Sequence, residues 1–292
     1  MNGWLAIYLR GVAMGAADLV PGVSGGTIAF VTGIYERLVD ALGALARAPQ
    51  RLWREGPAAV WRGVDLPFLA ALAAGIATSL FSLSRLVNRL LAEQPVLVWG
   101  FFLGLIAASI GHVARRLPRL GGAEWLCLAA GAAVAAGVAF APPLSLAISP
   151  PLLVAAGALA ACAMILPGIS GSFVLLLLGL YPPLIEAVAE RRWAWLALFG
   201  AGAAGGLLAF APWLSRLLHR HPGPTLATLT GLLAGSLAVV WPWQEMVAAG
   251  RRLWWPWQYP AGDPQLGIAL AAAGTGALLV LALEWWGRPA RA

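Results

Sequence analysis

The hydrophobic positions of this chain gather in long runs, a pattern typical of membrane-spanning helices. A helix needs ~20 apolar residues to cross the hydrocarbon of a bilayer. Six stretches reach or approach this length and each predicts one crossing: Pro67–Leu90, Pro95–Val113, Glu124–Phe140, Trp193–Leu218, Thr225–Trp241 and Leu266–Trp286. The more polar segment Ala46–Val64, with scattered Arg and Trp, predicts an interfacial helix on the membrane surface.

Two further apolar stretches, Trp4–Leu42 and Pro151–Val188, are long enough for two passes but contain Pro and Gly in the middle. Pro removes a backbone donor and Gly weakens a helix. We therefore expect each stretch to fold as a broken hairpin, in which two helical halves flank a non-helical turn. The half-helices after the turns are expected to begin at about Thr27 and Phe173.

The two broken stretches are copies of one another. A shift of 146 residues aligns Pro21–Leu42 with Pro167–Val188 without a gap, and eight of the 22 positions are identical. The shared pattern is Pro-Gly-x-Ser-Gly followed by Gly-x-Tyr, which apolar composition alone does not produce. Further matches downstream align Leu83–Leu86 with Leu214–Leu217, and Gly104–Ser109 with Gly231–Ser236.

Three crossings separate the two broken hairpins, an odd number, so the repeats are expected to have opposite orientations in the membrane. The predicted fold is an all-α integral membrane protein with inverted-topology repeats, each built from a broken or re-entrant hairpin and transmembrane helices. The whole chain, residues 1–292, forms one membrane domain. Repeat one covers about residues 4–120, repeat two about 150–242, and a final transmembrane helix about 266–286.

Composition supports a chain whose solvent is mostly lipid. Of its 292 residues, 61% are hydrophobic and 11% are charged, with a mean hydropathy of +0.81. Soluble domains carry roughly a quarter charged residues. These figures exclude a soluble globular protein, a disordered chain, a disulfide scaffold and a nucleic-acid binder.

The formal net charge of +7 comes from 19 basic residues, all of them Arg, which flank the apolar runs. The positive-inside rule favours a topology with both termini in the cytoplasm. That choice places Arg47, Arg51, Arg54, Arg62, Arg115, Arg116, Arg119, Arg216, Arg220, Arg288 and Arg291 inside, and only Arg85, Arg89, Arg191, Arg192, Arg251 and Arg252 outside.

The two Pro-Gly-x-Ser-Gly turns are the candidate binding site. Irregular backbone inside a bilayer must be buried in protein or line a polar cavity, and interrupted helices in inverted repeats form the substrate sites of many transporters. Glycine amides, hydroxyl groups and two helix N-termini then favour an anion such as phosphate or carboxylate. The candidate residues are Pro21, Gly22, Ser24, Gly25, Gly26 and Thr27 of the first turn, and Pro167, Gly168, Ser170, Gly171 and Ser172 of the second.

Three charged residues in or near the apolar stretches are further candidates. Asp18 lies deep in the first hairpin and its repeat partner is Met164, so it suits a role performed once, such as carrying a coupling proton. Capping a helix end or pairing with a nearby Arg explains it equally well. Arg85 and Arg216 occupy matching positions near the ends of their spans. Each is placed to reach a phosphate from one membrane face, although snorkelling to the lipid headgroups explains them equally well.

The segment Ala16–Thr27, followed by Gly33–Leu38, and its copy in Pro167–Ser172 and Gly179–Tyr181 resemble the bacterial polyprenyl-phosphate transporter family, formerly a domain of unknown function. The resemblance extends over nearly the whole chain. It implies a translocase in the bacterial plasma (inner) membrane that flips undecaprenyl phosphate and returns this lipid carrier to the cytoplasmic leaflet for cell-wall and surface-glycan synthesis.

Two alternatives stay open at this stage: a membrane phosphatase acting on the related pyrophosphate lipid, and a transporter of small anions. The turns contain Ser but neither Arg nor His, whereas a phosphatase needs an activated nucleophile. The sequence also lacks a Walker loop, a dinucleotide fingerprint and a metal-ligand cluster. We therefore expect no enzyme activity, no cofactor, no metal and no nucleic-acid partner, and the sequence does not determine the oligomeric state.

Overall fold

A computed structural model describes residues 3–56, 63–115, 121–144, 146–247, 250–260 and 262–287. Its helices are α1 (Gly3–Asp18), α2 (Gly25–Val31), α3 (Tyr35–Ala46), α4 (Ala48–Glu55), α6 (Leu66–Glu93), α7 (Pro95–Ala114), α8 (Gly122–Phe140), α9 (Pro150–Ile165), α10 (Gly171–Leu177), α11 (Tyr181–Ala189), α12 (Trp193–Arg220), α13 (Pro222–Ser236) and α14 (Leu266–Gly287). The short strands β1 (Gln244–Val247) and β2 (Gly250–Leu253) and the 3₁₀ turn η1 (Pro256–Gln258) lie between α13 and α14. The all-α membrane fold predicted from the sequence is confirmed.

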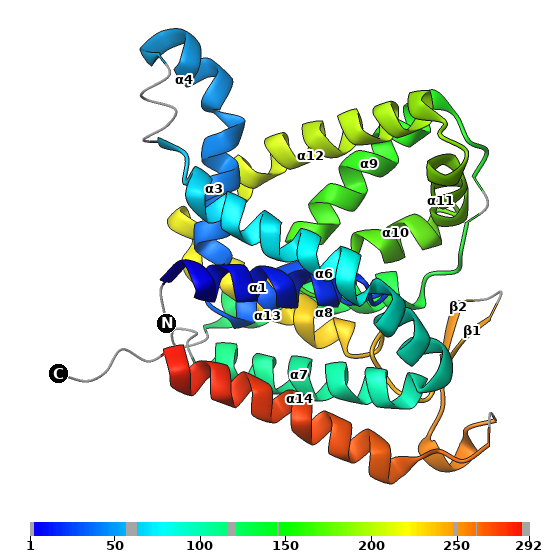
Figure 1. Ribbon diagram of the computed structural model, residues 1–292. Helices are drawn as coiled ribbons and strands as arrows, with labels where there is room; N and C mark the ends of the chain where they lie inside the picture. Colours follow the sequence, from blue (N-terminus) through cyan, green and yellow to red (C-terminus); the bar gives the residue numbers. More distant parts are fainter. Residues whose placement is uncertain are drawn as a thin grey trace.

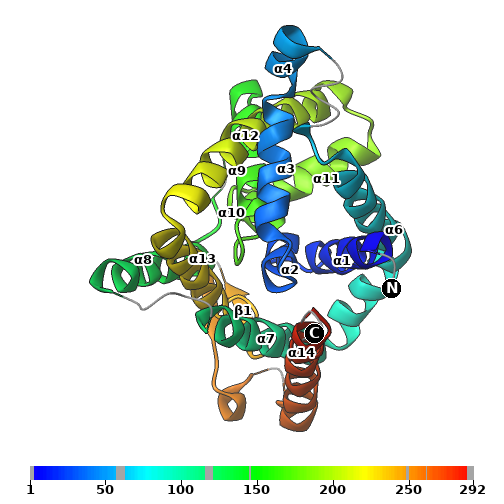
Figure 2. The ribbon, with the colours of Figure 1, turned by 90° about the vertical axis from the view of Figure 1, so that its left-hand side faces the viewer.

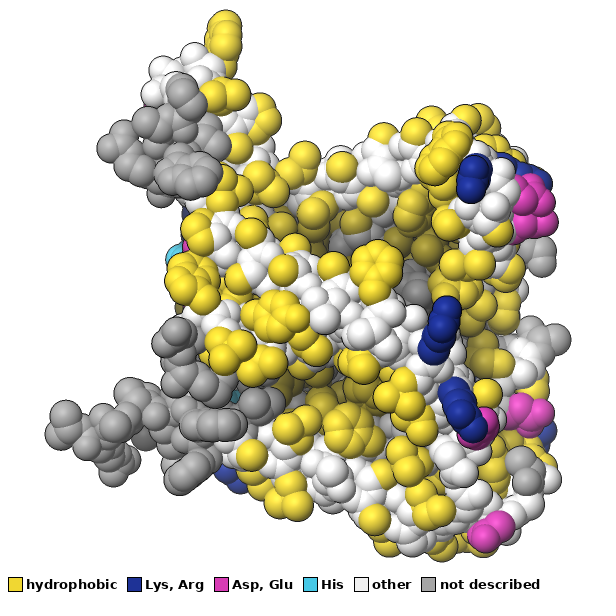
Figure 3. Space-filling view, in the orientation of Figure 1, with side chains coloured by type: hydrophobic (Ala, Val, Ile, Leu, Met, Phe, Trp, Pro, Cys, Tyr) yellow, Lys and Arg dark blue, Asp and Glu magenta, His cyan; other side chains and the backbone are white. Residues whose placement is uncertain are grey.

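In the part of the chain that the structure describes, four helices, α6, α7, α8 and α12, are long and apolar enough to cross a bilayer, and α10 with α11 forms a pair bent by 106°. Large apolar side chains on these helices point outward, and Phe81 of α6 is 89% exposed while Leu126 of α8 is 71% exposed. Hydrophobic side chains cover most of the face in Figure 3. Lipid is the solvent that makes such a surface stable.

Two expected crossings are shorter than the apolar pattern indicated. The stretch Thr225–Trp241 is helical only to Ser236, where α13 ends and the chain turns before Pro242. The described apolar part of α14 is likewise a short helix. The segment expected to be an interfacial helix contains α4, whose Trp53 is 90% exposed, and its residues 57–62 lie outside the described part.

Both broken hairpins fold as helix, turn, short helix and helix: α1–α2–α3 in one and α9–α10–α11 in the other. Gly33 and Gly179 have φ angles of 72° and 71°, a left-handed conformation that glycine adopts without a steric cost. Each reverses the chain so that the next helix begins two residues later, at Tyr35 and Tyr181. The Gly-x-Tyr signature thus has the same structural role in both copies.

The two copies run in opposite directions through the molecule. In Figure 1, α1 begins and α14 ends on the left, whereas α9 begins on the right. The pairs α1–α6 and α9–α12 are packed through matching glycines. A methyl group on Gly11 would collide with the carbonyl oxygen of Leu72, and one on Gly157, 146 residues later, with that of Phe199.

The most extensive remaining contacts join α8 to α13 and α14 to α7, and Figure 2 shows these as two neighbouring pairs. These two pairs also correspond to each other under the repeat. A methyl group on Gly104 would meet the backbone of Ala273 in α14, and one on Gly231, the repeat partner of Gly104, would meet Leu128 in α8. Each half therefore packs its last helix against the other half, and α8 corresponds to α14.

The only sheet in the described residues is the two-stranded hairpin β1–β2, which the all-helical expectation did not include. Its register pairs Glu245 with Arg252 and Met246 with Arg251. Residues paired directly across an antiparallel ladder share one face. Arg251 and Met246 therefore lie on one side of the hairpin, and Glu245 and Arg252 lie on the other.

Candidate functional site

The first turn links α1 to α2 and is closed by its own polar groups. Ser24 is the N-cap of α2, and its side-chain oxygen accepts a hydrogen bond from the Gly26 amide at 3.1 Å. The carboxylate of Asp18 accepts a hydrogen bond from the Gly25 amide at 2.7 Å. Gly22 adopts a φ of 93°. The Gly25 and Gly26 amides at the start of α2 are thus already paired, one of them with a carboxylate.

The second turn repeats this backbone with a different set of partners. Gly168 adopts a φ of 84°, and Ser170 is the N-cap of α10, with its oxygen 3.5 Å from the Phe173 amide and 2.9 Å from the hydroxyl of Ser172. Met164 stands where the first turn has Asp18. Within the described residues, the amides of Gly171 and Ser172 have no hydrogen-bond partner.

The two turns contact each other directly, although the bonded residues lie 140 and 141 positions apart in the chain. The Gly168 amide donates a hydrogen bond to the hydroxyl of Thr27 at 2.9 Å. The hydroxyl of Ser24 donates one to the carbonyl oxygen of Met164 at 3.0 Å. A Cβ atom on Gly26 would lie 2.7 Å from that same carbonyl, so only glycine permits this approach.

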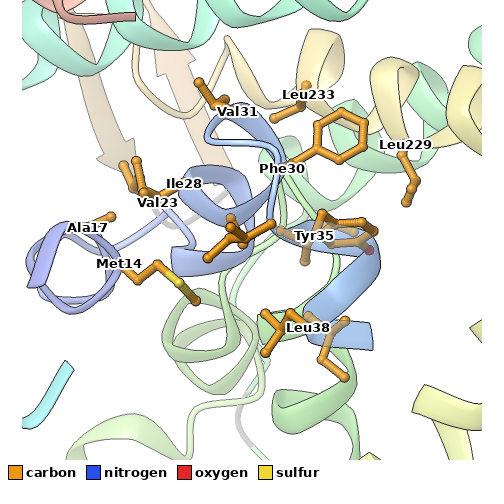
Figure 4. Packing of buried hydrophobic residues seen from close by; sticks show 14 of the residues in the cluster. Met14, Ala17, Val23, Ile28, Phe30, Val31, Tyr35, Leu38, Leu229 and Leu233 are labelled. Carbon is orange, nitrogen blue, oxygen red and sulfur yellow. The ribbon is translucent and has the colours of Figure 1, made fainter. Parts of the chain in front are cut away.

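The core of this junction is buried, and its edges are accessible. Ser24, Thr27 and Ser170 are 1%, 0% and 4% exposed, while Ser172 is half-buried and Pro21 is exposed. Figure 4 shows the apolar packing around α2, with Phe30 and Tyr35 beside Leu229 and Leu233 of α13. The rings of Phe30 and Tyr35 meet edge to face, with their centres 5.1 Å apart. This packing fixes α2, and with it the polar junction, in the interior.

Of the candidate turn residues, Ser24, Gly26 and Thr27 of the first turn contact the second turn at Met164 and Gly168, and Asp18 lies beside Gly25. The remaining candidates, Pro21, Gly22, Pro167, Ser170, Gly171 and Ser172, adjoin these residues along the two turns. The two half-helices begin at Gly25 and Gly171, two residues earlier than expected. The structure brings the two copies of the motif into direct contact.

The arginines Arg85 and Arg216 lie on exposed faces of α6 and α12, and neither forms a hydrogen bond or ion pair with a turn residue in the described chain. The two helices have equal length, 28 residues each. Aligning their ends places Arg216 opposite Arg89, one helical turn from Arg85, and Arg89 pairs with Glu93 at 2.8 Å. A role for Arg85 and Arg216 stays a prediction.

A large apolar cavity of about 640 Å³ adjoins the second turn through Leu166 and Ile169. Helices α8, α12 and α13 form its other walls, with Val134, Phe210, Trp213 and Leu229 among the lining side chains. A smaller pocket beside the β1–β2 hairpin reaches the first turn through Pro21 and contains Arg251. Sequence reasoning missed Arg251 because a basic pair in an external loop is typical of topology alone.

Among the described residues, no group of three or more His, Cys, Asp or Glu side chains could hold a metal ion. The chemistry that the junction offers is therefore that of hydroxyls, backbone amides and one carboxylate. The hydroxyls and the backbone amides can bind and orient an oxyanion, whereas an ionised carboxylate repels one. Two interrupted helices that meet at their breaks, within an α-helical membrane protein, define the class of membrane transporters with discontinuous helices.

The comparisons identify the family. The model described as "VCA0040-like: Undecaprenyl phosphate translocase-like" matches residues 14–252, and the chain belongs to this family. The protein "Polyprenyl-phosphate transporter" of Vibrio cholerae serotype O1 is 44% identical over 246 residues, which cover 84% of this chain and 80% of the relative. One of the same name from Staphylococcus aureus is 31% identical over 257 residues, covering 82% and 86%. No solved structure matches the chain.

Proposed function

We propose that the protein is a translocase (flippase) that moves undecaprenyl phosphate across the bacterial plasma membrane and returns this lipid carrier to the cytoplasmic leaflet for cell-wall and surface-glycan synthesis. The family and the names of the relatives from Vibrio cholerae and Staphylococcus aureus support a polyprenyl phosphate as substrate. The observation that carries the proposal is the hydrogen-bonded junction of the two turns, because hydroxyls and backbone amides of both halves meet there at one buried point.

The phosphate binds at the second turn in this conformation. The amides at the start of α2 are occupied by Asp18 and Ser24, whereas the amides of Gly171 and Ser172 are without partners among the described residues. The hydroxyls of Ser170 and Ser172 bond each other at 2.9 Å, which leaves one of their two O–H groups as a further donor. Hydrogen bonds to a charged group contribute about 1.5–3 kcal/mol each, so these groups together replace much of the hydration that the phosphate loses.

The isoprenoid tail occupies the apolar cavity beside this turn. The cavity volume of about 640 Å³ lies within the ~300–1,000 Å³ of pockets that hold drug-sized molecules. The cavity therefore accommodates part of the tail while the rest stays in lipid. Leu166 and Ile169 belong to both the cavity wall and the second turn. The head and the first part of the tail are therefore held by adjoining surfaces.

Movement between leaflets is a rocking of one half against the other, with the junction as the alternating contact. Asp18 is the proposed coupling group. Its carboxylate and a phosphate compete for the Gly25 amide, so protonation of Asp18 weakens its hydrogen bond to this amide and lets the charged substrate displace it at the first turn. Arg85 and Arg216 attract the phosphate at the two surfaces, and the chain ends lie in the cytoplasm. No chemical step is part of this cycle.

The test is reconstitution into liposomes with fluorescently labelled undecaprenyl phosphate and measurement of its exchange between leaflets. Ser170→Ala should slow exchange about tenfold or more, since a hydrogen bond to a charged group is lost. Ser109→Ala is the matched control, because Ser109 is equally buried and its hydroxyl bonds only the Leu105 carbonyl of its own helix. Equal exchange rates for both variants and the unaltered protein would refute the site.

A further inference from the structure

The small pocket on the hairpin side has a cationic group that the junction does not use. It holds about 230 Å³ and is lined by Pro21, Trp99, Phe173, Gln244, Met246 and Arg251, among others. We call it the hairpin pocket. Pro21 belongs to the first turn, and Phe173 lies in the first turn of α10, where its amide approaches Ser170. The hairpin pocket therefore adjoins both halves of the junction.

Arg251 is held in a fixed position without a carboxylate partner among the described residues. Its Nε donates a hydrogen bond to the carbonyl of Ala139, and one terminal nitrogen donates to the carbonyl of Val239, each at 3.2 Å. Its guanidinium lies 5.2 Å from the centre of the Phe173 ring. Burial lowers the pKa of Arg251 to about 10, which still leaves it protonated at neutral pH.

The unused hydrogen-bonding capacity of the hairpin pocket fits a phosphate monoester. A guanidinium has five N–H donors, and the two carbonyls occupy two of those of Arg251. The buried Oε1 of Gln244 has no partner among the described residues, while its amide nitrogen donates to Val239 at 2.7 Å. A phosphate monoester near neutral pH accepts from Arg and, in its monoprotonated form, donates a P–O–H.

We propose that the hairpin pocket is a second anion site, in which Arg251 binds the phosphate monoester of the lipid headgroup before it reaches the junction of the two turns. This inference rests on the proposed function, since it assigns an entry point to the same substrate. Phe173 lies between the two sites, with its ring against Arg251 and its amide at Ser170. The headgroup thus passes from a guanidinium to the amides at the start of α10.

The hairpin offers a matched control for the charge of Arg251. Arg252 is the next residue of the same strand, is exposed, and stacks on Trp254 with its guanidinium 4.1 Å from the ring centre. It faces away from the hairpin pocket, opposite Glu245. Arg251→Gln and Arg252→Gln therefore remove the same charge from neighbouring positions, and only the first removes it from the pocket.

The experiment measures binding to the purified full chain with farnesyl phosphate, farnesol and inorganic phosphate as separate probes. Arg251→Gln should weaken farnesyl phosphate binding about ten- to a hundredfold, as expected for a lost hydrogen-bonded charge. Arg252→Gln should stay within about twofold of the unaltered protein, and farnesol binding should not change in either variant. If Arg251 has a purely structural role, Arg251→Gln weakens the binding of farnesyl phosphate and of farnesol alike, and this result would overturn the proposal.

Two further outcomes distinguish a lipid phosphate from free phosphate as the ligand, and the pocket proposal from the proposed function. Equal, Arg251-dependent binding of inorganic phosphate would assign the pocket to free phosphate and overturn the lipid assignment. Arg251-dependent binding of farnesyl phosphate without leaflet exchange by the unaltered protein would refute the proposed function and leave the pocket's ligand assigned. If Arg251→Gln does not fold, Met246→Glu places a negative charge in the same pocket, with Met246→Gln as its neutral control. Equal affinities for these two variants would overturn the proposal.

Discussion

The hydrogen bond from the Gly168 amide to the hydroxyl of Thr27 gives the sharpest test of the junction. Thr27 is completely buried, and the 2.9 Å bond joins the two halves of the molecule. Thr27→Val keeps the approximate shape of the side chain and replaces the hydroxyl, which accepts from the Gly168 amide, with a methyl group. The substitution therefore leaves the packing intact and leaves the Gly168 amide buried without a partner.

The expected cost follows from that unpaired amide. A buried donor left unsatisfied destabilises the folded protein by about 1–3 kcal/mol. For a chain of this size, each kcal/mol lowers the midpoint of thermal unfolding by about 2–4 °C, so a fall of about 2–12 °C is expected. If the bond forms in only one transport conformation, the same energy shifts the population of that conformation by about 5- to 150-fold.

The assay is thermal unfolding of the purified protein together with leaflet exchange in liposomes. Thr230→Val is the matched control, because Thr230 is 1% exposed and its hydroxyl donates to the Leu226 carbonyl within its own helix. Thr27→Ser should behave like the unaltered protein, since it keeps the acceptor. The reasoning would be refuted if Thr27→Val unfolded at the temperature of Thr27→Ser.

Three further predictions concern packing, coupling and charge. Gly104→Leu should destabilise the protein by about 1–3 kcal/mol because it forces α14 away from α7. Gly111→Leu, on the same helix but with open space around it, should keep the thermal unfolding midpoint of the unaltered protein. Equal midpoints for the two variants would contradict the packing. Asp18→Asn keeps an acceptor for the Gly25 amide but cannot ionise, so leaflet exchange in liposomes with an imposed pH gradient should lose the dependence that the unaltered protein shows, and a retained dependence would exclude Asp18 as the coupling group. Because the pKa of Arg251 is about 10, farnesyl phosphate affinity should fall as the pH rises through about 10. An affinity that does not change between about pH 9 and 11 would remove Arg251 from the site.

The sequence alone determined the fold class and the repeat. Long apolar runs have one stable solution in lipid, the helix, since every backbone group must be satisfied within the segment. The Pro-Gly-x-Ser-Gly turns and the Gly-x-Tyr signature are local features: φ angles of 93° and 84° at Gly22 and Gly168, and 72° and 71° at Gly33 and Gly179, are demands that only glycine meets easily. Local chemistry therefore predicted where the helices break.

Only the tertiary structure decided which groups meet and which remain free. Nothing in the spacing of Thr27 and Gly168 announces their hydrogen bond, because it depends on how the two halves dock. The exchange of α8 and α14 between the halves likewise follows from glycine contacts across the interface. In the sequence, Arg251 is indistinguishable from an ordinary loop arginine. In the structure, the β1–β2 register places it on the face of the hairpin that contacts Phe173, opposite to the face of Arg252. A one-dimensional pattern records each residue's own preference, whereas a site depends on distances between residues far apart in the chain.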